Sequence, residues 1–170
     1  VDAPKPATEF DPLRRLDSGA GSKANGNELS VALVGAGNLA KWAHLPNIQK
    51  INGVRLHAVY STHGARGKSY AKRFGAEYSC SDYDEVLNDP KIDMVLITSR
   101  HQYHAEQALR ALAAGKNVFI EKPMAITIDE CTQMVDAMQA AGRVLIVGHS
   151  HSFDAPALLA RDLIDRDVIG

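Results

Sequence analysis

The chain has 170 residues, of which 45% are hydrophobic and 23% charged, and its formal net charge is −1. This length suffices for one domain with its own core and is too short for two full ones. The balanced charge argues against nucleic-acid binding, and the apolar runs are far shorter than the about 20 residues of a membrane span. Cys80 and Cys131 lack the spacing of a metal knuckle or a redox pair, so we expect a reducing, cytoplasmic location.

Residues 1–28 are predicted to be a flexible linker. The stretch 17–27 consists of small and polar residues, which bury too little apolar surface to offset the entropic cost of ordering. Residues 10–16 hint at a short helix, which is equally compatible with the tail of an upstream domain. Because the chain begins with Val1, we expect it to be a piece of a longer protein.

From residue 29 onward, short apolar runs alternate with longer segments of helical period. This alternation is typical of a parallel sheet buried on both faces by helices. The predicted strands are 30–34, 54–60, 77–79, 94–98, 117–120 and 144–148. The predicted helices are 39–50, 65–74, 83–87, 104–114, 128–141 and 155–168.

A glycine-rich loop joins the first of these strands to the first helix. Its pattern is G-x-G-x-x-A, beginning at Gly35. Gly35 permits a tight turn and Gly37 lets the backbone approach a pyrophosphate, while the helix start at Asn38 and Leu39 presents backbone N–H groups to the anion. A turn that merely joins strand to helix is the alternative. The flanking elements favour dinucleotide binding.

The glycine loop and the alternating elements together predict the fold class. We expect an α/β fold of the Rossmann type over residues 29–154, with a doubly wound, six-stranded, mainly parallel sheet of order 3-2-1-4-5-6. Residues 155–170 are predicted to form a helix that packs on the sheet and leads to a substrate-binding domain beyond the chain.

The end of the second predicted strand bears on the choice of dinucleotide. NAD-binding folds place an acidic residue there for the ribose hydroxyls, but positions 29–76 contain none. Ser61 and Thr62 can donate hydrogen bonds, and Arg66 with Lys68 or His63 can neutralise a 2′-phosphate. Arg66 and Lys68 are alternatively ordinary solvated charges at a helix start. We therefore expect NADP or NAD as the cofactor, with NADP slightly favoured.

Several segments resemble one family of oxidoreductases. Besides the glycine loop, they are the run 113–123, which ends in Glu121-Lys122-Pro123, and Gly148-His149 leading to Phe153-Asp154. The stretch 31–170 is similar to the nucleotide-binding half of the glucose-fructose oxidoreductase, inositol dehydrogenase and rhizopine-catabolism (Gfo/Idh/MocA) family. The combination of these segments is specific, whereas the glycine loop alone is not.

The resemblance implies roles for particular residues. It places Lys122 beside the nicotinamide and the substrate as the catalytic residue, where its ammonium polarises the oxygen that is oxidised. It implies that Glu121 pairs with or orients that lysine. Ser99, His101 and His104 occupy the family's T-P-N-x-x-H segment, which is expected to contact the ribose and nicotinamide, although the usual Pro and Asn of that segment are replaced.

The family completes its active site with an Asp and a His from a second domain, which the chain does not reach. We expect the parent protein to transfer hydride between the cofactor and a sugar, cyclitol or related hydroxy compound, and to form a homo-oligomer. The chain alone should bind nucleotide without turnover. The N-terminal segment also resembles the junction that follows a zinc-dependent alcohol dehydrogenase domain in bacterial fusion proteins.

Three alternatives to a dehydrogenase are compatible with parts of the sequence. A non-catalytic NAD(P)-sensing module is the main alternative, and Lys122 argues against it because a sensor needs no lysine at the hydride-transfer position. A methyltransferase would also want an acidic residue after the second strand. The histidine pairs at 101–104 and 149–151 suggest zinc, but no Cys lies near them and loop histidines near a nucleotide usually serve hydrogen bonding, so no metal is predicted.

Overall fold

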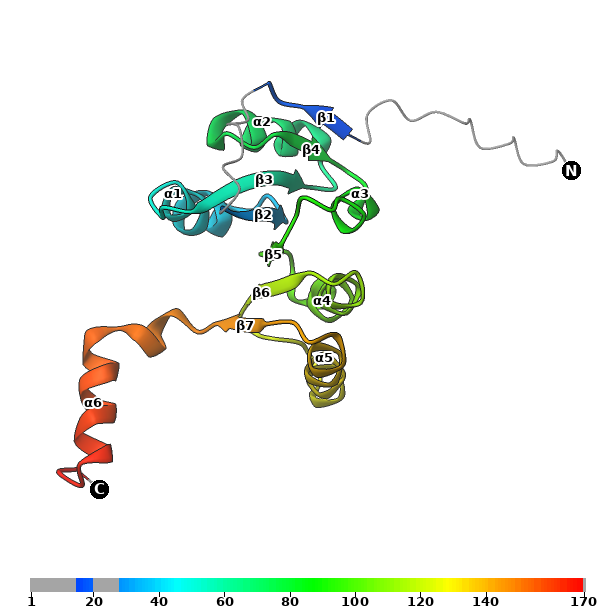
Figure 1. Ribbon diagram of the computed structural model, residues 1–170. Coiled ribbons are helices and arrows are strands. Elements are labelled where there is room, and N and C mark those ends of the chain that lie inside the picture. Colours follow the sequence, from blue (N-terminus) through cyan, green and yellow to red (C-terminus); the bar gives the residue numbers. More distant parts are fainter. Residues whose placement is uncertain (1–14, 20–27, 170) are drawn as a thin grey trace, which may run out of the picture.

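One sheet runs through the part of the chain that the computed structural model describes, residues 15–19 and 28–169 (Figure 1). Its strand order is β1-β4-β3-β2-β5-β6-β7. All neighbouring strands are parallel except β1 and β4. The strands are β1 (Arg15–Asp17), β2 (Leu29–Val34), β3 (Val54–Tyr60), β4 (Tyr78–Cys80), β5 (Met94–Ile97), β6 (Asn117–Glu121) and β7 (Leu145–Gly148).

The prediction of six strands is wrong, because the sheet has seven. The six predicted strands are present as β2 to β7, and their relative order is the predicted one. The seventh strand, β1, lies in the segment that was predicted to be a linker and, over 10–16, a short helix. Residues 10–14 of that expected helix lie outside the described residues. A three-residue strand carries too little periodicity to be recognised, and it forms here because β4 offers an edge.

The helices are η1 (Ala40–His44), α1 (Leu45–Ile48), α2 (Gly64–Phe74), α3 (Tyr83–Leu87), η2 (His101–Tyr103), α4 (His104–Ala113), α5 (Ile128–Ala141), η3 (Ser150–Phe153) and α6 (Ala155–Asp165). The six predicted helices are present, the first of them divided into η1 and α1, and two short helices, η2 and η3, were not predicted. Thr127 and Glu130 form a capping box at the start of α5, which satisfies backbone N–H groups that have no partner within the helix. Gly142, with φ of 59°, ends it in the left-handed conformation.

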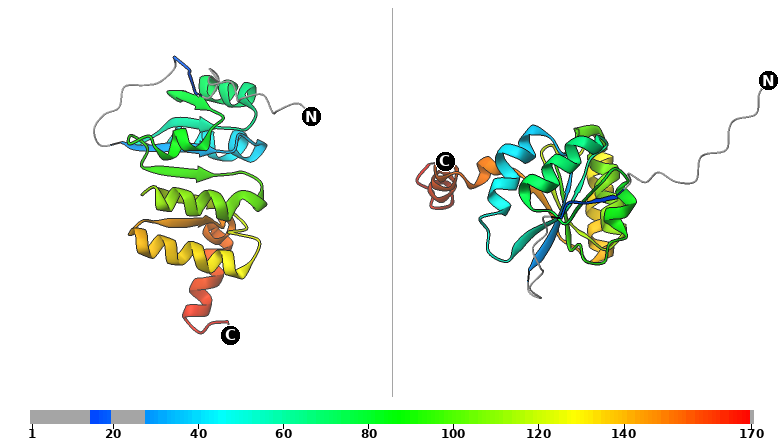
Figure 2. Two further views of the ribbon diagram at one scale, coloured as in Figure 1. Left: turned by 90° about the vertical axis from the view of Figure 1, so that its right-hand side faces the viewer. Right: turned by 90° about the horizontal axis from the view of Figure 1, so that it is seen from above.

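Two apolar clusters cover the two faces of the sheet. The helices η1, α1 and α2 pack on one face over β2, β3 and β4, and α3, α4 and α5 pack on the other (Figure 2). This arrangement is the doubly wound one, and it leaves the carboxyl ends of the parallel strands at one open edge.

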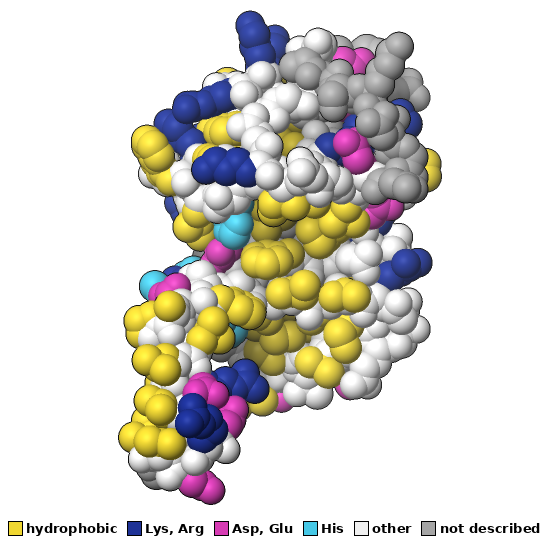
Figure 3. All heavy atoms as spheres, turned by 60° about the vertical axis from the view of Figure 1, so that its left-hand side comes forward, with side chains coloured by type: hydrophobic (Ala, Val, Ile, Leu, Met, Phe, Trp, Pro, Cys, Tyr) yellow, Lys and Arg dark blue, Asp and Glu magenta, His cyan; other side chains and the backbone are white. Residues whose placement is uncertain are grey.

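The face that carries η1 is covered unevenly. Leu33, Leu96, Phe119 and Ile146 are register partners across β2, β5, β6 and β7. Leu33 is 0% exposed, Leu96 4% and Ile146 45%, so the covering helices end before β7. Figure 3 shows hydrophobic side chains gathered on this side of the molecule.

The prediction that the last helix packs on the sheet is wrong. No residue of α6 is buried, and the helix projects away from the sheet (Figures 1 and 2). Its exposed side chains include Leu158, Leu159 and Ile164. The apolar period of the sequence predicts a helix but not the surface on which that helix packs.

Within residues 15–19 and 28–169, no helix combines the length and the apolar character needed to cross a membrane. Cys80 and Cys131 are free thiols. Burial raises the pKa of the Cys80 thiol to about 12, so that this thiol is a protonated, apolar part of the core.

Candidate functional site

The glycine loop begins at the carboxyl end of β2 and is fixed by its neighbours. Gly35 has φ of +102°, and a Cβ on it would lie 2.8 Å from the backbone nitrogen of Ser99. The Gly35 N–H donates to the Tyr60 carbonyl at 3.0 Å, and the Thr98 hydroxyl donates to the Gly35 carbonyl at 2.7 Å. The fold itself therefore requires glycine at position 35.

Gly37 differs, because the fold leaves room for a side chain there. A Cβ at this position would meet only the Thr98 carbonyl oxygen, at 3.9 Å, and the φ of Gly37 is not positive. The Tyr70 hydroxyl on α2 donates to the Gly37 carbonyl at 3.2 Å and holds the loop in place. A glycine that the fold does not need keeps space open for something else, and close approach of a phosphate is the reason that the sequence pattern gives.

A cavity of about 380 Å³ opens beside this loop, at the carboxyl ends of β2, β3 and β5. It is lined by Gly35, Ala36, Gly37, Tyr60, Ser61, Thr62, His63, Arg66, Thr98, Ser99, Arg100, Tyr103 and Gln107. Of the residues predicted to bind the cofactor, Gly35, Gly37, Ser61, Thr62, Arg66 and Ser99 come together here. The others, Asn38, Leu39, His101, His104 and Glu121, do not line the cavity, and neither does Lys122.

The cavity carries positive charge and no carboxylate. Arg66 and Arg100 line it, and within residues 15–19 and 28–169 neither of them pairs with an acidic side chain. Such a lining suits an anion. Arg100, Tyr103 and Gln107 were not predicted to line the cavity. The sequence held one indication of Arg100, because an arginine replaces the usual proline of the family segment there.

The serine and threonine after β3 differ in what they offer. Ser61 is buried, and its hydroxyl exchanges hydrogen bonds with the His63 backbone, donating at 3.3 Å and accepting at 3.2 Å. Thr62 is exposed, and its hydroxyl lies 3.3 Å from His63 Nδ1. Ser61 therefore shapes the turn, while Thr62 is placed to hydrogen-bond a ligand.

The Glu121 carboxylate, at the end of β6, is held by a histidine of η1. His44 Nε2 on η1 lies 2.7 Å from Glu121 Oε1, and Glu121 Oε2 accepts the backbone N–H of Lys122 at 3.2 Å. No ion pair joins this carboxylate to the Lys122 ammonium among the described side chains. Glu121 thus orients the lysine's backbone, and its side-chain partner is His44. Lys122 itself is exposed and precedes a cis-peptide bond to Pro123.

A second histidine holds the other end of the same loop. His104, at the start of α4, is completely buried. Its Nδ1 lies 2.8 Å from the Pro123 carbonyl oxygen and its Nε2 lies 3.1 Å from the Ser99 carbonyl oxygen. His104 therefore ties the loop of Lys122 to the loop that lines the cavity, and it acts behind the site rather than in it. His101 is exposed beside it.

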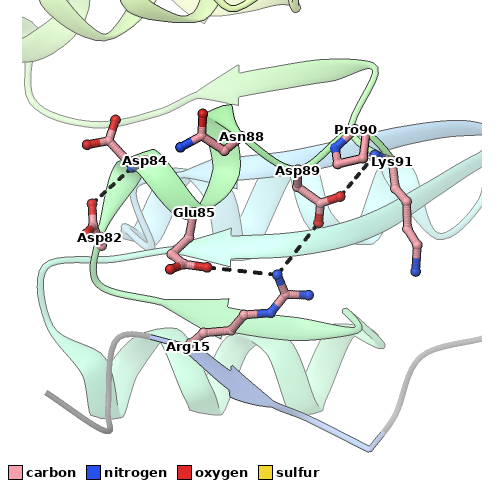
Figure 4. A pocket seen from close by; sticks show the side chains of 8 residues that line it. All are labelled: Arg15, Asp82, Asp84, Glu85, Asn88, Asp89, Pro90 and Lys91. Atoms are coloured by element: carbon pink, nitrogen blue, oxygen red, sulfur yellow. Dashed lines mark hydrogen bonds and ion pairs between the residues drawn. The ribbon is translucent and has the colours of Figure 1, made fainter. Parts of the chain in front are cut away.

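Nowhere in the described residues do three or more His, Cys, Asp or Glu side chains gather as metal ligands would. A second cavity, of about 440 Å³, lies at the β1 edge of the sheet (Figure 4). It is lined by Arg15, Asp82, Asp84, Glu85, Asn88, Asp89, Pro90 and Lys91. Its four carboxylates repel phosphates, so we place the nucleotide site at the smaller cavity beside the glycine loop.

The chain is similar in sequence to known dehydrogenases and reductases. The chain is 39% identical over 142 residues to a 1-carboxy-3-chloro-3,4-dihydroxycyclohexa-1,5-diene dehydrogenase of Comamonas testosteroni. The aligned residues make up 84% of this chain and 36% of that protein. It is 34% identical over 138 residues to a 1,5-anhydro-D-fructose reductase of Ensifer adhaerens, and the aligned residues make up 81% of this chain and 41% of that protein.

Solved structures give the same result. The myo-inositol 2-dehydrogenase of Lactobacillus plantarum superimposes with a TM-score of 0.76 at 26% identity, over 84% of this chain and 42% of that one. A 3-ketoreductase of Actinomadura kijaniata in complex with NADP superimposes with a TM-score of 0.78 at 26% identity, over 85% of this chain and 46% of that one. The chain thus spans less than half the length of these relatives.

The family assignment rests on most of the chain. Residues 29–149, from the start of β2 to just beyond β7, match the oxidoreductase family with an NAD-binding Rossmann fold. This confirms the resemblance inferred from the glycine loop and the Glu121-Lys122-Pro123 segment. The chain is the NAD-binding domain of a member of the Gfo/Idh/MocA oxidoreductase family.

Proposed function

We propose that the cavity beside the glycine loop binds a nicotinamide dinucleotide and that the parent protein is an NAD(P)-dependent oxidoreductase. The observation that carries this proposal is Gly37, where the fold leaves room for a side chain and the sequence provides none. When bound, the cofactor supplies hydride transfer. The chain's own residues bind its phosphates and position a lysine at its reactive end.

NADP is the preferred cofactor in this proposal. Arg66 and Arg100 line a cavity that holds no carboxylate, and Thr62 offers a hydroxyl beside them. A 2′-phosphate there would gain charge-assisted hydrogen bonds, and no acidic side chain would repel it. The 3-ketoreductase whose structure resembles this chain binds NADP, which supports the same choice.

Lys122 is the catalytic residue of the proposal. Its loop is fixed at both ends, by His44 through Glu121 and by His104 through Pro123, while its own side chain stays exposed. An ammonium held in this way stabilises negative charge that develops on a hydroxyl oxygen as its proton leaves. His44 also follows the glycine loop in the chain, so one helix connects the phosphate-binding end of the site to the lysine.

The substrate is a sugar, a cyclitol or a related hydroxy compound. The relatives named above act on an anhydro sugar, an inositol and a dihydroxycyclohexadiene, according to their names. A downstream domain completes the site and selects the substrate, as the greater length of these relatives supports. The parent protein is a cytoplasmic homo-oligomer, and the residues before the domain are its junction with an alcohol dehydrogenase domain.

Two measurements test the proposal. Titration of the chain with NADPH and NADH should give saturable binding of both, tighter for NADPH. With NADP⁺ or NAD⁺ as the hydride acceptor, the chain should show no oxidation of a panel of sugars and cyclitols. In the parent protein, Lys122→Ala should abolish turnover and leave nucleotide affinity within about twofold. Steady turnover by the parent carrying Lys122→Ala would show that the protein uses another residue.

The same measurements separate an enzyme from a non-catalytic NAD(P)-sensing module. A sensor would bind nucleotide, and Lys122→Ala in the parent would change no reaction because none occurs. The anchoring of the lysine loop by two histidines favours the enzyme, since nucleotide binding alone does not call for it.

A further inference from the structure

Residues 15–18 lie outside the family match, which begins at residue 29, and yet they join the sheet. β1 pairs antiparallel with β4 over three residue pairs, and the Ser18 N–H donates to the Glu77 carbonyl at 2.9 Å. Without β1, the strand β4 would be the edge of the sheet, with backbone N–H and C=O groups open to pairing. Such an edge accepts an extended segment as an additional strand.

Arg15 gives this pairing a specific side-chain contact. Its guanidinium carbon lies 3.6 Å from the centroid of the Tyr78 ring. Its Nη1 lies 3.9 Å from Glu85 Oε2 and 4.0 Å from Asp89 Oδ2. Figure 4 shows the arginine reaching from β1 toward both carboxylates. A planar cation that stacks on an aromatic face while facing two acids is a role that arginine fills better than lysine.

The residues that Arg15 contacts in this way, Tyr78, Glu85 and Asp89, all lie within the family match, and Asp89 is held in place by further contacts. The Asp89 side chain is 7% exposed. Its carboxylate accepts hydrogen bonds from the Tyr78 hydroxyl at 3.0 Å and the Lys91 backbone N–H at 2.9 Å, and it lies 3.1 Å from His57 Nε2. Burial alone would raise the pKa of Asp89, but these hydrogen bonds outweigh it and hold the pKa below its ordinary value. The acceptor is therefore charged and in place before a cation arrives.

We propose that the β4 edge, with the pocket at Glu85 and Asp89, is a docking site for an extended strand anchored by an arginine, and that residues 15–18 of this chain occupy it. Arg15 pairs with Cys80, the last residue of β4. Because the Cys80 carbonyl also accepts the Ser61 N–H, the anchored strand enters at the same edge of the sheet as the nucleotide cavity. The docking site fixes where residues that precede the family domain join it.

Hydrogen exchange on the full chain tests this proposal. The β4 amides that pair with β1 should exchange slowly, and Arg15→Ala should speed their exchange about tenfold, through loss of one cation–π contact and two partly exposed ion pairs. Arg15→Lys keeps the charge and should give an intermediate rate. Arg161→Ala, on exposed α6, is the matched control and should leave these amides unchanged.

Three results would overturn the proposal. Equal exchange in wild type and Arg15→Ala would show that the arginine anchors nothing, and fast exchange in wild type would show that the strand is not docked. Protection that disappears on dilution together with a dimeric mass would assign the strand to a second copy. If Arg15→Ala also unprotects β6, the fold has failed and Arg15→Lys supplies the comparison. Nucleotide titration of the same samples tests the proposed function separately.

Discussion

Replacing Gly37 by alanine separates what the fold needs from what a bound nucleotide needs. The new Cβ would have its nearest neighbour, the Thr98 carbonyl oxygen, at 3.9 Å, and the backbone at Gly37 is not in the left-handed region. Alanine is therefore accommodated without strain. We expect the free energy of unfolding of Gly37→Ala to stay within about 1 kcal/mol of wild type, with any gain arising from a less flexible unfolded chain.

The matched variant Gly35→Ala meets the opposite situation. Its Cβ would lie 2.8 Å from the nitrogen and 2.9 Å from the Cα of Ser99, on a backbone with φ of +102°. Backbone strain and crowding each cost about 1–3 kcal/mol, so we expect the free energy of unfolding to fall by about 2–6 kcal/mol. Urea unfolding followed by circular dichroism measures both variants under the same conditions.

Nucleotide binding should be lost in the stable variant. A methyl group at Gly37 occupies the space through which the backbone approaches a pyrophosphate, and one lost hydrogen bond to a charged group is worth about 1.5–3 kcal/mol. We therefore expect Gly37→Ala to weaken NADPH binding about 10- to 100-fold in a calorimetric titration. A Gly37→Ala variant that is stable and binds NADPH as tightly as wild type would refute the reasoning.

Three further predictions follow from other parts of the structure. Arg66→Ala should weaken NADPH binding about 10- to 100-fold through the lost phosphate contact and leave NADH binding unchanged, with Lys68→Ala, outside the cavity, as the control in the same titration. Burial lowers the pKa of His57 below 6.5, so the unfolded chain takes up a proton that the native ring resists, and stability should fall as pH drops below 6.5. Urea unfolding across that pH range should show that the free energy of unfolding depends less on pH in His57→Gln than in wild type. The exposed control His151→Gln should show the same pH dependence as wild type. An equal pH dependence in all three proteins would contradict the assignment of this effect to His57. His104→Ala removes a completely buried ring whose two nitrogens lie 2.8 Å and 3.1 Å from carbonyl oxygens, and should lower the free energy of unfolding by about 2–4 kcal/mol in the same assay.

The parts of the fold that local patterns determine were predictable. The alternation of apolar runs and helical segments gave six strands and their order, and the glycine loop identified β2 as the strand beside the cofactor. β1 escaped because three residues show no period, and its position depends on the free β4 edge and the contact of Arg15 with Tyr78. The helix α6 was recognised, but the sequence does not say against what it packs.

The site was predictable where its residues follow a strand directly. Gly35 and Ser61 are the first residues after β2 and β3, and both line the cavity. Arg100 enters the cavity through the loop after β5 and was missed as a lining residue. The pairing of His44 with Glu121 joins residues 77 positions apart, and no local pattern links them. The family resemblance implies that Glu121 pairs with or orients Lys122. The Glu121 carboxylate accepts the Lys122 backbone N–H, and its side-chain partner is His44.

The most direct test of the central claim is a calorimetric titration of the purified chain with NADPH and with NADH. The positive cavity beside the glycine loop predicts one saturable site, with NADPH bound about tenfold or more tightly than NADH because the 2′-phosphate gains charge-assisted hydrogen bonds. Equal or tighter binding of NADH would contradict the cofactor assignment. Absence of saturable binding for both nucleotides would contradict the site itself.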